Sequence, residues 1–253
     1  MPGKPAALEP LSSDGPAMEL ARSLYQQGQE LTSFAARGSV NYIDGNQRHF
    51  FRFEFILSRP GGLSFTVLDP LGRPALRVVS DWSRFYALDY LELLATVGLA
   101  TDENLRAVIP INLEIDDLLA VMTNALMVNP VAAAADRFKG GSIGVLRVAA
   151  DRPQPGSVWL VSLDNLSSGP VISSCELKKM AGGDDFRVRY NRFTSLAVES
   201  QPPGSKDFPM SIEATVGRET TFEIRFDDVR LGPSLPAELF IFQVPGGFAV
   251  QEI

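Results

Sequence analysis

LSFTVLDPLGRPALRVV, residues 63–79, contains two apolar segments joined by a short turn. Every second residue on each arm is apolar, namely Leu63, Phe65, Val67, Leu76 and Val78. This period of two predicts a β-hairpin with one apolar face. Between the arms, Pro70 lacks a backbone N–H and Gly72 permits the positive φ of a tight reversal. We expect the turn to hold Leu71 out toward solvent; the alternative is that Leu71 folds under a neighbouring loop.

The same alternation recurs on both sides of this hairpin and predicts one curved antiparallel sheet. Before it, residues 34–42 and 50–57 alternate in the same way and predict the two strands of another hairpin. After it, residues 82–88 predict one more strand. Seven later segments also alternate at least in part: 143–149, 158–163, 171–179, 186–193, 196–200, 208–216 and 221–226. The predicted fold class is therefore mainly β (α+β), with about 11 strands in one sheet.

Four segments carry helical patterns instead. Residues 17–31 place apolar side chains at helical spacing with polar ones opposite, which predicts an amphipathic N-terminal helix. The middle of the chain predicts a short helix at 90–99, a stronger one at 115–127 and an alanine-rich one at 131–138. We expect the middle helices to form a lid across the open end of the sheet.

The acidic composition argues against a nucleic-acid partner. The chain of 253 residues has a formal net charge of -7 and a sequence pI near 4.9, whereas phosphate binding favours a basic surface. Cys175 is the single cysteine, which excludes an internal disulfide and a cysteine-based zinc site. We predict neither a metal nor a cofactor.

Residues suited to catalysis are sparse. The single histidine, His49, lies within a predicted strand without nearby Cys or Asp partners, so we interpret it as a surface residue. Three Asp-Asp doublets are typical of turns and helix caps rather than of a paired-carboxylate active site. These observations favour a protein that is not an enzyme.

Apolar residues gather on one face of the predicted sheet. They are Phe51, Phe53, Phe55, Leu63, Phe65, Val67, Leu76, Val78, Trp159, Phe186 and Phe222, with Leu118 and Met122 from the lid. One interpretation is an ordinary core that the helices fill completely. The other is a hydrophobic cavity between sheet and helices that accepts acyl chains, since each buried CH₂ group contributes about 0.8 kcal/mol.

Three motifs follow one another in the first third of the chain. They are FAARGSVNY at residues 34–42, the phenylalanine-rich strand after it, and DPLG at residues 69–72 before an apolar strand. In this order they resemble the LolB family and the related LolA-like outer-membrane lipoproteins, which are lipoprotein localisation factors. The chain departs from that family at residues 118–122, LLAVM, where the family has a tryptophan-containing motif.

The resemblance implies an unclosed β-barrel with a helical lid, located in the periplasm and tethered to the outer membrane by a lipidated N-terminal cysteine. It implies that the protein accepts the acyl chains of lipoproteins or lipids, with a periplasmic carrier protein as donor, and releases them into the outer membrane. It further implies that Leu71, held by Pro70 and Gly72, is the apolar residue that enters the bilayer.

The sequence also predicts how the chain is divided into a tether and a domain. Residues 1–16 are rich in Pro, Ser and Gly, and we expect them to be a flexible tether left after removal of an export signal and a lipid-attachment cysteine. Residues 17–253 are then a single domain.

The alternative function is a non-transporting outer-membrane lipoprotein that serves as a protein-interaction or envelope-assembly module; an enzyme is the third hypothesis.

Overall fold

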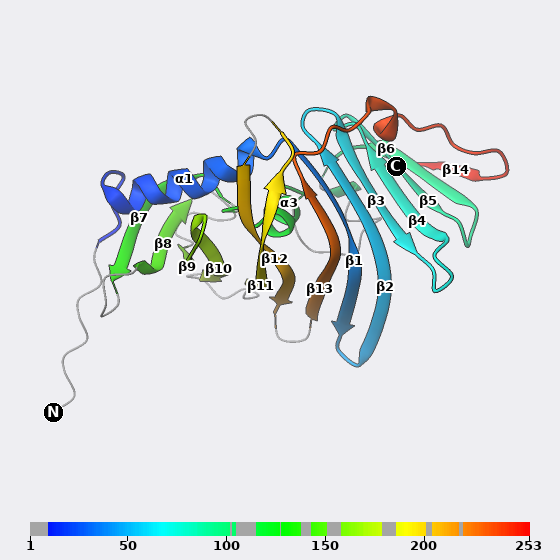
Figure 1. Cartoon of the computed structure of the whole chain (residues 1–253). Helices are drawn as coiled ribbons and strands as arrows, with labels where there is room; N and C mark the ends of the chain where they lie inside the picture. Colours follow the sequence, from blue (N-terminus) through cyan, green and yellow to red (C-terminus); the bar gives the residue numbers. More distant parts are fainter. Residues whose placement is uncertain are drawn as a thin grey trace.

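The polypeptide folds around one curved β-sheet (Figure 1). The computed structural model describes residues 10–101, 103–104, 115–126, 128–137, 143–150, 158–178, 186–200, 204–217 and 220–253. Within these residues the sheet has 14 strands, in the order β14-β6-β5-β4-β3-β2-β1-β13-β12-β11-β10-β9-β8-β7. The edge strands β14 and β7 do not pair with each other, so the sheet is unclosed.

Neighbouring strands in this order pair antiparallel, except that β14 runs parallel to β6. The first group of strands is β1 (Ser33–Asp44), β2 (Gln47–Ser58), β3 (Gly62–Leu68), β4 (Pro74–Ser80), β5 (Arg84–Asp89) and β6 (Leu94–Leu99). The second group is β7 (Pro130–Arg137), β8 (Ile143–Ala150), β9 (Val158–Leu166), β10 (Gly169–Lys178), β11 (Phe186–Val198), β12 (Gly204–Val216), β13 (Thr220–Leu231) and β14 (Ala249–Glu252). The predicted class, mainly β with an unclosed antiparallel sheet, is confirmed.

Two predicted helices are wrong, which is the main reason why the strand number differs. Residues 90–99 form a turn followed by β6, and most of residues 131–138 form β7. The two segments predicted at 186–193 and 196–200 are one strand, β11. Only the helix predicted at 115–127 remains of the lid within the described residues, as α3 (Ile115–Thr123).

Strand β7 shows why local propensity failed. It contains four consecutive alanines, 132–135, and alanine has the highest helix propensity. Pairing with β8 and two backbone hydrogen bonds between Ser12 and Ala133, of 3.0 and 2.8 Å, hold the segment extended instead. The small side chains leave room for the N-terminal helix α1 (Pro16–Glu30) to lie against β7 (Figure 1).

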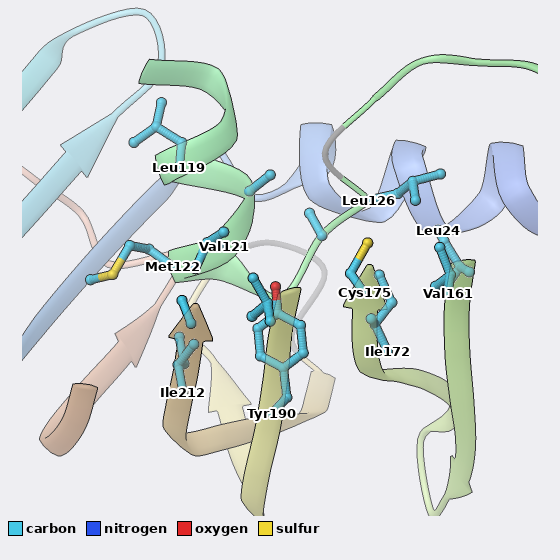
Figure 2. Close-up of a cluster of buried hydrophobic side chains, with 14 of the residues drawn as sticks. Leu24, Leu119, Val121, Met122, Leu126, Val161, Ile172, Cys175, Tyr190 and Ile212 are labelled. Carbon is cyan, nitrogen blue, oxygen red and sulfur yellow. The ribbon is translucent and has the colours of Figure 1, made fainter. Parts of the chain in front are cut away.

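The core lies on the face of the sheet that packs against α1 and α3, which we call the inner face. Phe34 of β1 is its centre, with its ring centroid 5.8 Å from that of Phe55 and 5.6 Å from that of Phe208. Buried residues of α1 and α3, including Leu24 and Met122, belong to the same cluster (Figure 2). The helices therefore fill this part of the inner face.

The C-terminal segment packs against the opposite face of β3 to β5 and then ends in β14, which extends the sheet beside β6. The short 3-10 helix η1 (Ala237–Phe240) buries Phe240 against the start of β3. Further along, the ring of Phe242 lies 5.9 Å from that of Tyr86 and beneath the guanidinium of Arg77, at 5.6 Å. In β4 and β5, Val79 and Leu88 on this opposite face are buried as well as Val78 and Ala87 on the inner face, so the apolar runs of these two strands lack simple alternation.

Candidate functional site

Burial changes along the inner face from one end of the sheet to the other. On β2, the inner-face residues Phe53, Phe55 and Leu57 are buried, Phe51 is half-buried and His49 is exposed. The same gradient follows the neighbouring strands, because their residues are in register with those of β2. The inner face therefore has a buried end under the helices and a partly exposed end near the β1–β2 turn.

The partly exposed end is apolar, and we call its residues the apolar rim. They are Tyr42, Phe51, Phe65, Val67, Leu76 and Phe222, all half-buried and contributed by β1, β2, β3, β4 and β13. Tyr42 stacks on Phe222 with ring centroids 4.8 Å apart and on His49 at 5.8 Å. The rim thus continues across five adjacent strands.

The structure divides the predicted cavity residues between core and rim. Those that are buried are Phe53, Phe55, Leu63, Val78, Met122, Trp159 and Phe186. Those that belong to the rim are Phe51, Phe65, Val67, Leu76 and Phe222. Leu118 lies in α3, but its side chain is outside the described part of the structure. Tyr42 was not among the predicted site residues, although its alternation with Asn41 and Ile43 places it on the same face.

The hydroxyl of Tyr190 is a polar group within the apolar core beneath α3. The Tyr190 hydroxyl is buried and has no hydrogen-bond partner among the described residues (Figure 2). Burial, and to a lesser degree the nearby Cys175, raises the pKa of the Tyr190 phenol well above its usual value. The phenol therefore stays neutral and is a potential hydrogen-bond donor in a hydrophobic environment.

The β3–β4 turn lies at the rim end of the sheet, directly after Val67 and Leu68. Its Asp69 carboxylate accepts hydrogen bonds from the backbone N–H groups of Leu71 and Arg73, both at 2.8 Å. The Arg73 N–H, more than any other group, lowers the pKa of Asp69. Gly72 has a φ of 79°, and Leu71 is 78% exposed. The expected exposure of Leu71 is confirmed, and the turn is fixed by its own hydrogen bonds.

Sequence reasoning missed a second exposed turn at residues 90–93, because a helix was predicted there. Leu91 is 78% exposed and Leu93 is 51% exposed. The turn follows Asp89, whose carboxylate accepts hydrogen bonds from the N–H groups of Leu91 at 2.8 Å and Glu92 at 3.0 Å. The sequence did contain a signal for this turn, because Asp89 stands two residues before Leu91 just as Asp69 stands two residues before Leu71.

The outer face of the central strands has a different chemistry. Ion pairs join Arg37 to Glu54 at 3.0 Å and Arg187 to Glu176 at 2.8 Å. In the part of the chain that the structure describes, no group of three or more His, Cys, Asp or Glu side chains could hold a metal ion. No described helix is long and apolar enough to cross a bilayer.

No protein-family model matches the chain, and no curated protein matches it in sequence. Solved structures do match. A LolA superfamily protein from Nitrosomonas europaea has a TM-score of 0.54 at 12% identity, over 88% of this chain and 97% of its own. The chain has the LolA-like fold. A DUF1329 family protein from Desulfovibrio piger has a TM-score of 0.57 at 8% identity, over 90% of this chain and 98% of its own.

The LolA-like fold agrees with the resemblance that the three sequence motifs indicated. The two structural matches cover 88% and 90% of this chain, so the shared fold includes strands of both groups. At 8% and 12% identity the similarity concerns the fold alone.

Proposed function

We propose that this protein binds the acyl chains of a lipoprotein or lipid against its inner face and passes them to the outer membrane. The observation that carries the proposal is positional: the apolar rim and the exposed Leu71 lie at the same end of the sheet. Val67 of the rim leads into the Leu71 turn, and Leu76 of the rim follows it. An acyl chain that leaves the rim there reaches the residue best placed to enter a bilayer.

The energetics of such a transfer require no covalent step. Each CH₂ group moved from water to an apolar surface contributes about 0.8 kcal/mol, and a bilayer offers the chain a similar environment. Rim residues that are half-exposed in the free protein can bury their remaining area against a ligand. Insertion of one leucine side chain contributes about 1.5 to 3 kcal/mol, which favours a short, reversible encounter with the membrane.

The cellular setting belongs to the same proposal. In this proposal the protein is periplasmic and anchored to the outer membrane through a lipidated N-terminal cysteine, as the resemblance of the sequence motifs to the LolB family implies. The partners are then an acylated lipoprotein or lipid as cargo and a periplasmic carrier protein as donor. The rim, with its side chains buried only in part, is the part of the inner face that a donor can reach.

The alternative, an interaction module without transport, requires a protein-sized patch on the outer face. The described residues of β1, β2 and β11 to β13 instead present charged and polar side chains there, several of them in ion pairs. Exposed ion pairs of this kind contribute little to binding or stability. Phe50, which is 67% exposed, is the one large apolar residue exposed on that face of these strands as described.

The acyl-binding step is tested with a matched pair of neighbouring phenylalanines. Phe51 is on the rim and Phe50 is on the outer face of the same strand. Native mass spectrometry with a triacylated peptide should detect a complex for the natural protein. Phe51→Ser should weaken the affinity roughly tenfold or more, whereas Phe50→Ser should leave it unchanged. A natural protein that retains no acylated peptide, or equal affinities for both variants, would refute the proposed site.

The delivery step is tested separately with Leu71→Glu. Since Leu71 is remote from the buried core and its backbone is held by Asp69, the variant should fold and bind the triacylated peptide normally. Transfer of the peptide to liposomes should slow roughly tenfold, because a carboxylate replaces the inserting side chain. Unchanged transfer would exclude this role for Leu71.

A further inference from the structure

We propose that the β5–β6 turn, residues 90–93, is a second membrane-inserting element, and that Leu91 and Leu93 enter the same bilayer surface as Leu71. The inference rests on the proposed delivery function and extends it to residues that no motif indicates. The partner is the surface of a zwitterionic phospholipid bilayer. Two inserted turns fix the orientation of a protein on a membrane, whereas a single leucine leaves it free to rotate.

The two turns are neighbours at one end of the sheet (Figure 1). The Leu71 turn begins β4 and the second turn ends β5, and these strands pair so that Leu76 lies opposite Asp89. The Tyr90 N–H donates a hydrogen bond of 2.9 Å to the Ala75 carbonyl, which ties the second turn to the start of β4. The exposed leucines of both turns therefore lie at the same end of the sheet, on neighbouring hairpins.

Both turns share one hydrogen bond. In each, an aspartate carboxylate accepts a hydrogen bond of 2.8 Å from the backbone N–H of a leucine two positions later, Leu71 or Leu91. The second donor differs, since it is the Arg73 N–H for Asp69 and the Glu92 N–H for Asp89. Leu71 and Leu91 are each 78% exposed. Leu93 also has a φ of 51°, a left-handed conformation that leucine rarely adopts. The turn thus holds apolar side chains in water with a fixed backbone.

The charges near the two turns favour a zwitterionic surface. The carboxylates of Asp69 and Asp89 are occupied by backbone N–H groups, and Arg73 pairs with Asp69 at 2.7 Å. Glu92 lies between the two leucines of the second turn, and the whole chain has a net charge of -7. An anionic surface would repel this protein, so apolar insertion must supply the attraction.

The single natural cysteine makes the test direct. Cys175 is 2% exposed, so a cysteine introduced at an exposed position can be labelled selectively with the environment-sensitive fluorophore NBD. Three full-length variants are compared: Leu71→Cys, Leu91→Cys and Leu99→Cys. Leu99 is a matched control, because it is 61% exposed but lies at the opposite end of β6. The probe is a vesicle of pure phosphatidylcholine, without cargo.

Labels at positions 71 and 91 should both increase in emission on phosphatidylcholine vesicles, while the label at 99 stays unchanged. Leu91→Glu should reduce the vesicle affinity reported by the label at 71 roughly tenfold, and Leu93→Glu should reduce it by a smaller factor. Vesicles with added phosphatidylglycerol should bind less protein, not more.

Entry of the label at 71 without entry of the label at 91 would overturn the second insertion element and leave the proposed delivery function intact. Entry of neither label would overturn the inference together with the delivery step, while acyl binding would still be decided by the mass spectrometry of Phe51 and Phe50 variants. Stronger binding to anionic than to zwitterionic vesicles would also contradict the inference, because attraction would then come from charge.

Discussion

The two ends of the inner face contain the same kinds of side chain in opposite states. At the buried end, Phe34 packs among Phe55, Phe208 and Phe226 with no exposed area. At the rim, Tyr42 and Phe222 stack at 4.8 Å and remain half-exposed. Side-chain chemistry is equal at the two ends, so the difference lies in where α1 and α3 cover the sheet.

This difference separates stability from function along a single set of strands. The covered end contributes the core that holds the sheet together, since aromatic residues dominate core energetics when they are fully buried. The rim has apolar area left for a ligand, and both exposed leucine turns lie beside it. Substitutions at the two ends should therefore change different measurements.

The largest expected effect is on stability at the buried end. Phe34→Ala should lower the free energy of unfolding by about 3 to 5 kcal/mol, because it leaves a cavity in the centre of the aromatic cluster. Phe51→Ala at the rim should cost only about 1 kcal/mol. Urea denaturation followed by circular dichroism measures both. Equal losses would show that the rim is part of the core.

The next effect concerns how α1 closes the buried end. A Cβ added at Gly28 would lie far inside van der Waals distance of the Cβ of Ala125, two residues after the end of α3. Gly28→Val should therefore destabilise the protein by about 1 to 3 kcal/mol by separating α1 from this segment. The control is Gly204→Ala, which has open space around the added Cβ and should be nearly neutral. Thermal unfolding of both variants is the measurement.

A smaller effect is expected at Tyr190, where the core contains an unpartnered hydroxyl. Tyr190→Phe should leave stability unchanged or raise it by up to about 1 kcal/mol, because it removes a buried polar group without changing shape. A loss of more than that would mean that the hydroxyl has a partner in solution. Denaturant titration at neutral pH distinguishes the outcomes.

The raised pKa of Tyr190 also sets a pH dependence. The unfolded phenol loses its proton near its usual pKa of 10.0, whereas the folded one keeps its proton to higher pH. The folded state then binds more protons, so this contribution to stability is complete below pH 10 and is lost as pH rises above it. In Tyr190→Phe this part of the alkaline loss should be absent. Unfolding curves recorded from neutral to alkaline pH test the difference.

The smallest expected effect is confined to the β3–β4 turn that carries Leu71. Asp69→Ala should speed hydrogen exchange of the Leu71 and Arg73 amides and leave global stability unchanged, because the carboxylate holds only the turn. Because the pKa of Asp69 is lowered, its contribution is complete above the ordinary value of 3.8, and the hydrogen bonds are lost only as pH falls through the lower folded-state pKa. Asp81→Ala breaks a similar turn at the opposite end of β4 and should leave the Leu71 amide protected. Amide exchange measured by NMR would contradict this if both variants behaved alike.

The hairpins could be predicted because their signals are local. Strict alternation in β2 and β3 identified the inner face, and Gly72 with the flanking prolines identified the exposed turn. The helix α1 was also predictable, since its apolar spacing and Pro16 at its start agree. In these elements, neighbours in sequence determine the structure.

Each failure involves at least one partner far away in sequence. Residues 94–99 form β6 because they pair with β5 on one side and with β14, from the C-terminal end of the chain, on the other. The alanines of β7 are extended because β8 and Ser12 satisfy their backbone groups. The exposed Leu91 was hidden by the same error that predicted a helix over residues 90–99. No local propensity contains this information.

The sequence by itself determined that one face of a curved sheet is apolar and that Leu71 is held at a tight turn, because alternation and turn chemistry act over a few residues. Only the tertiary structure decided which end of that face is covered and which becomes the rim beside two leucine turns. The physical reason is that α1 and α3 bury a limited area, and their position depends on long-range packing such as the close approach of Gly28 to Ala125.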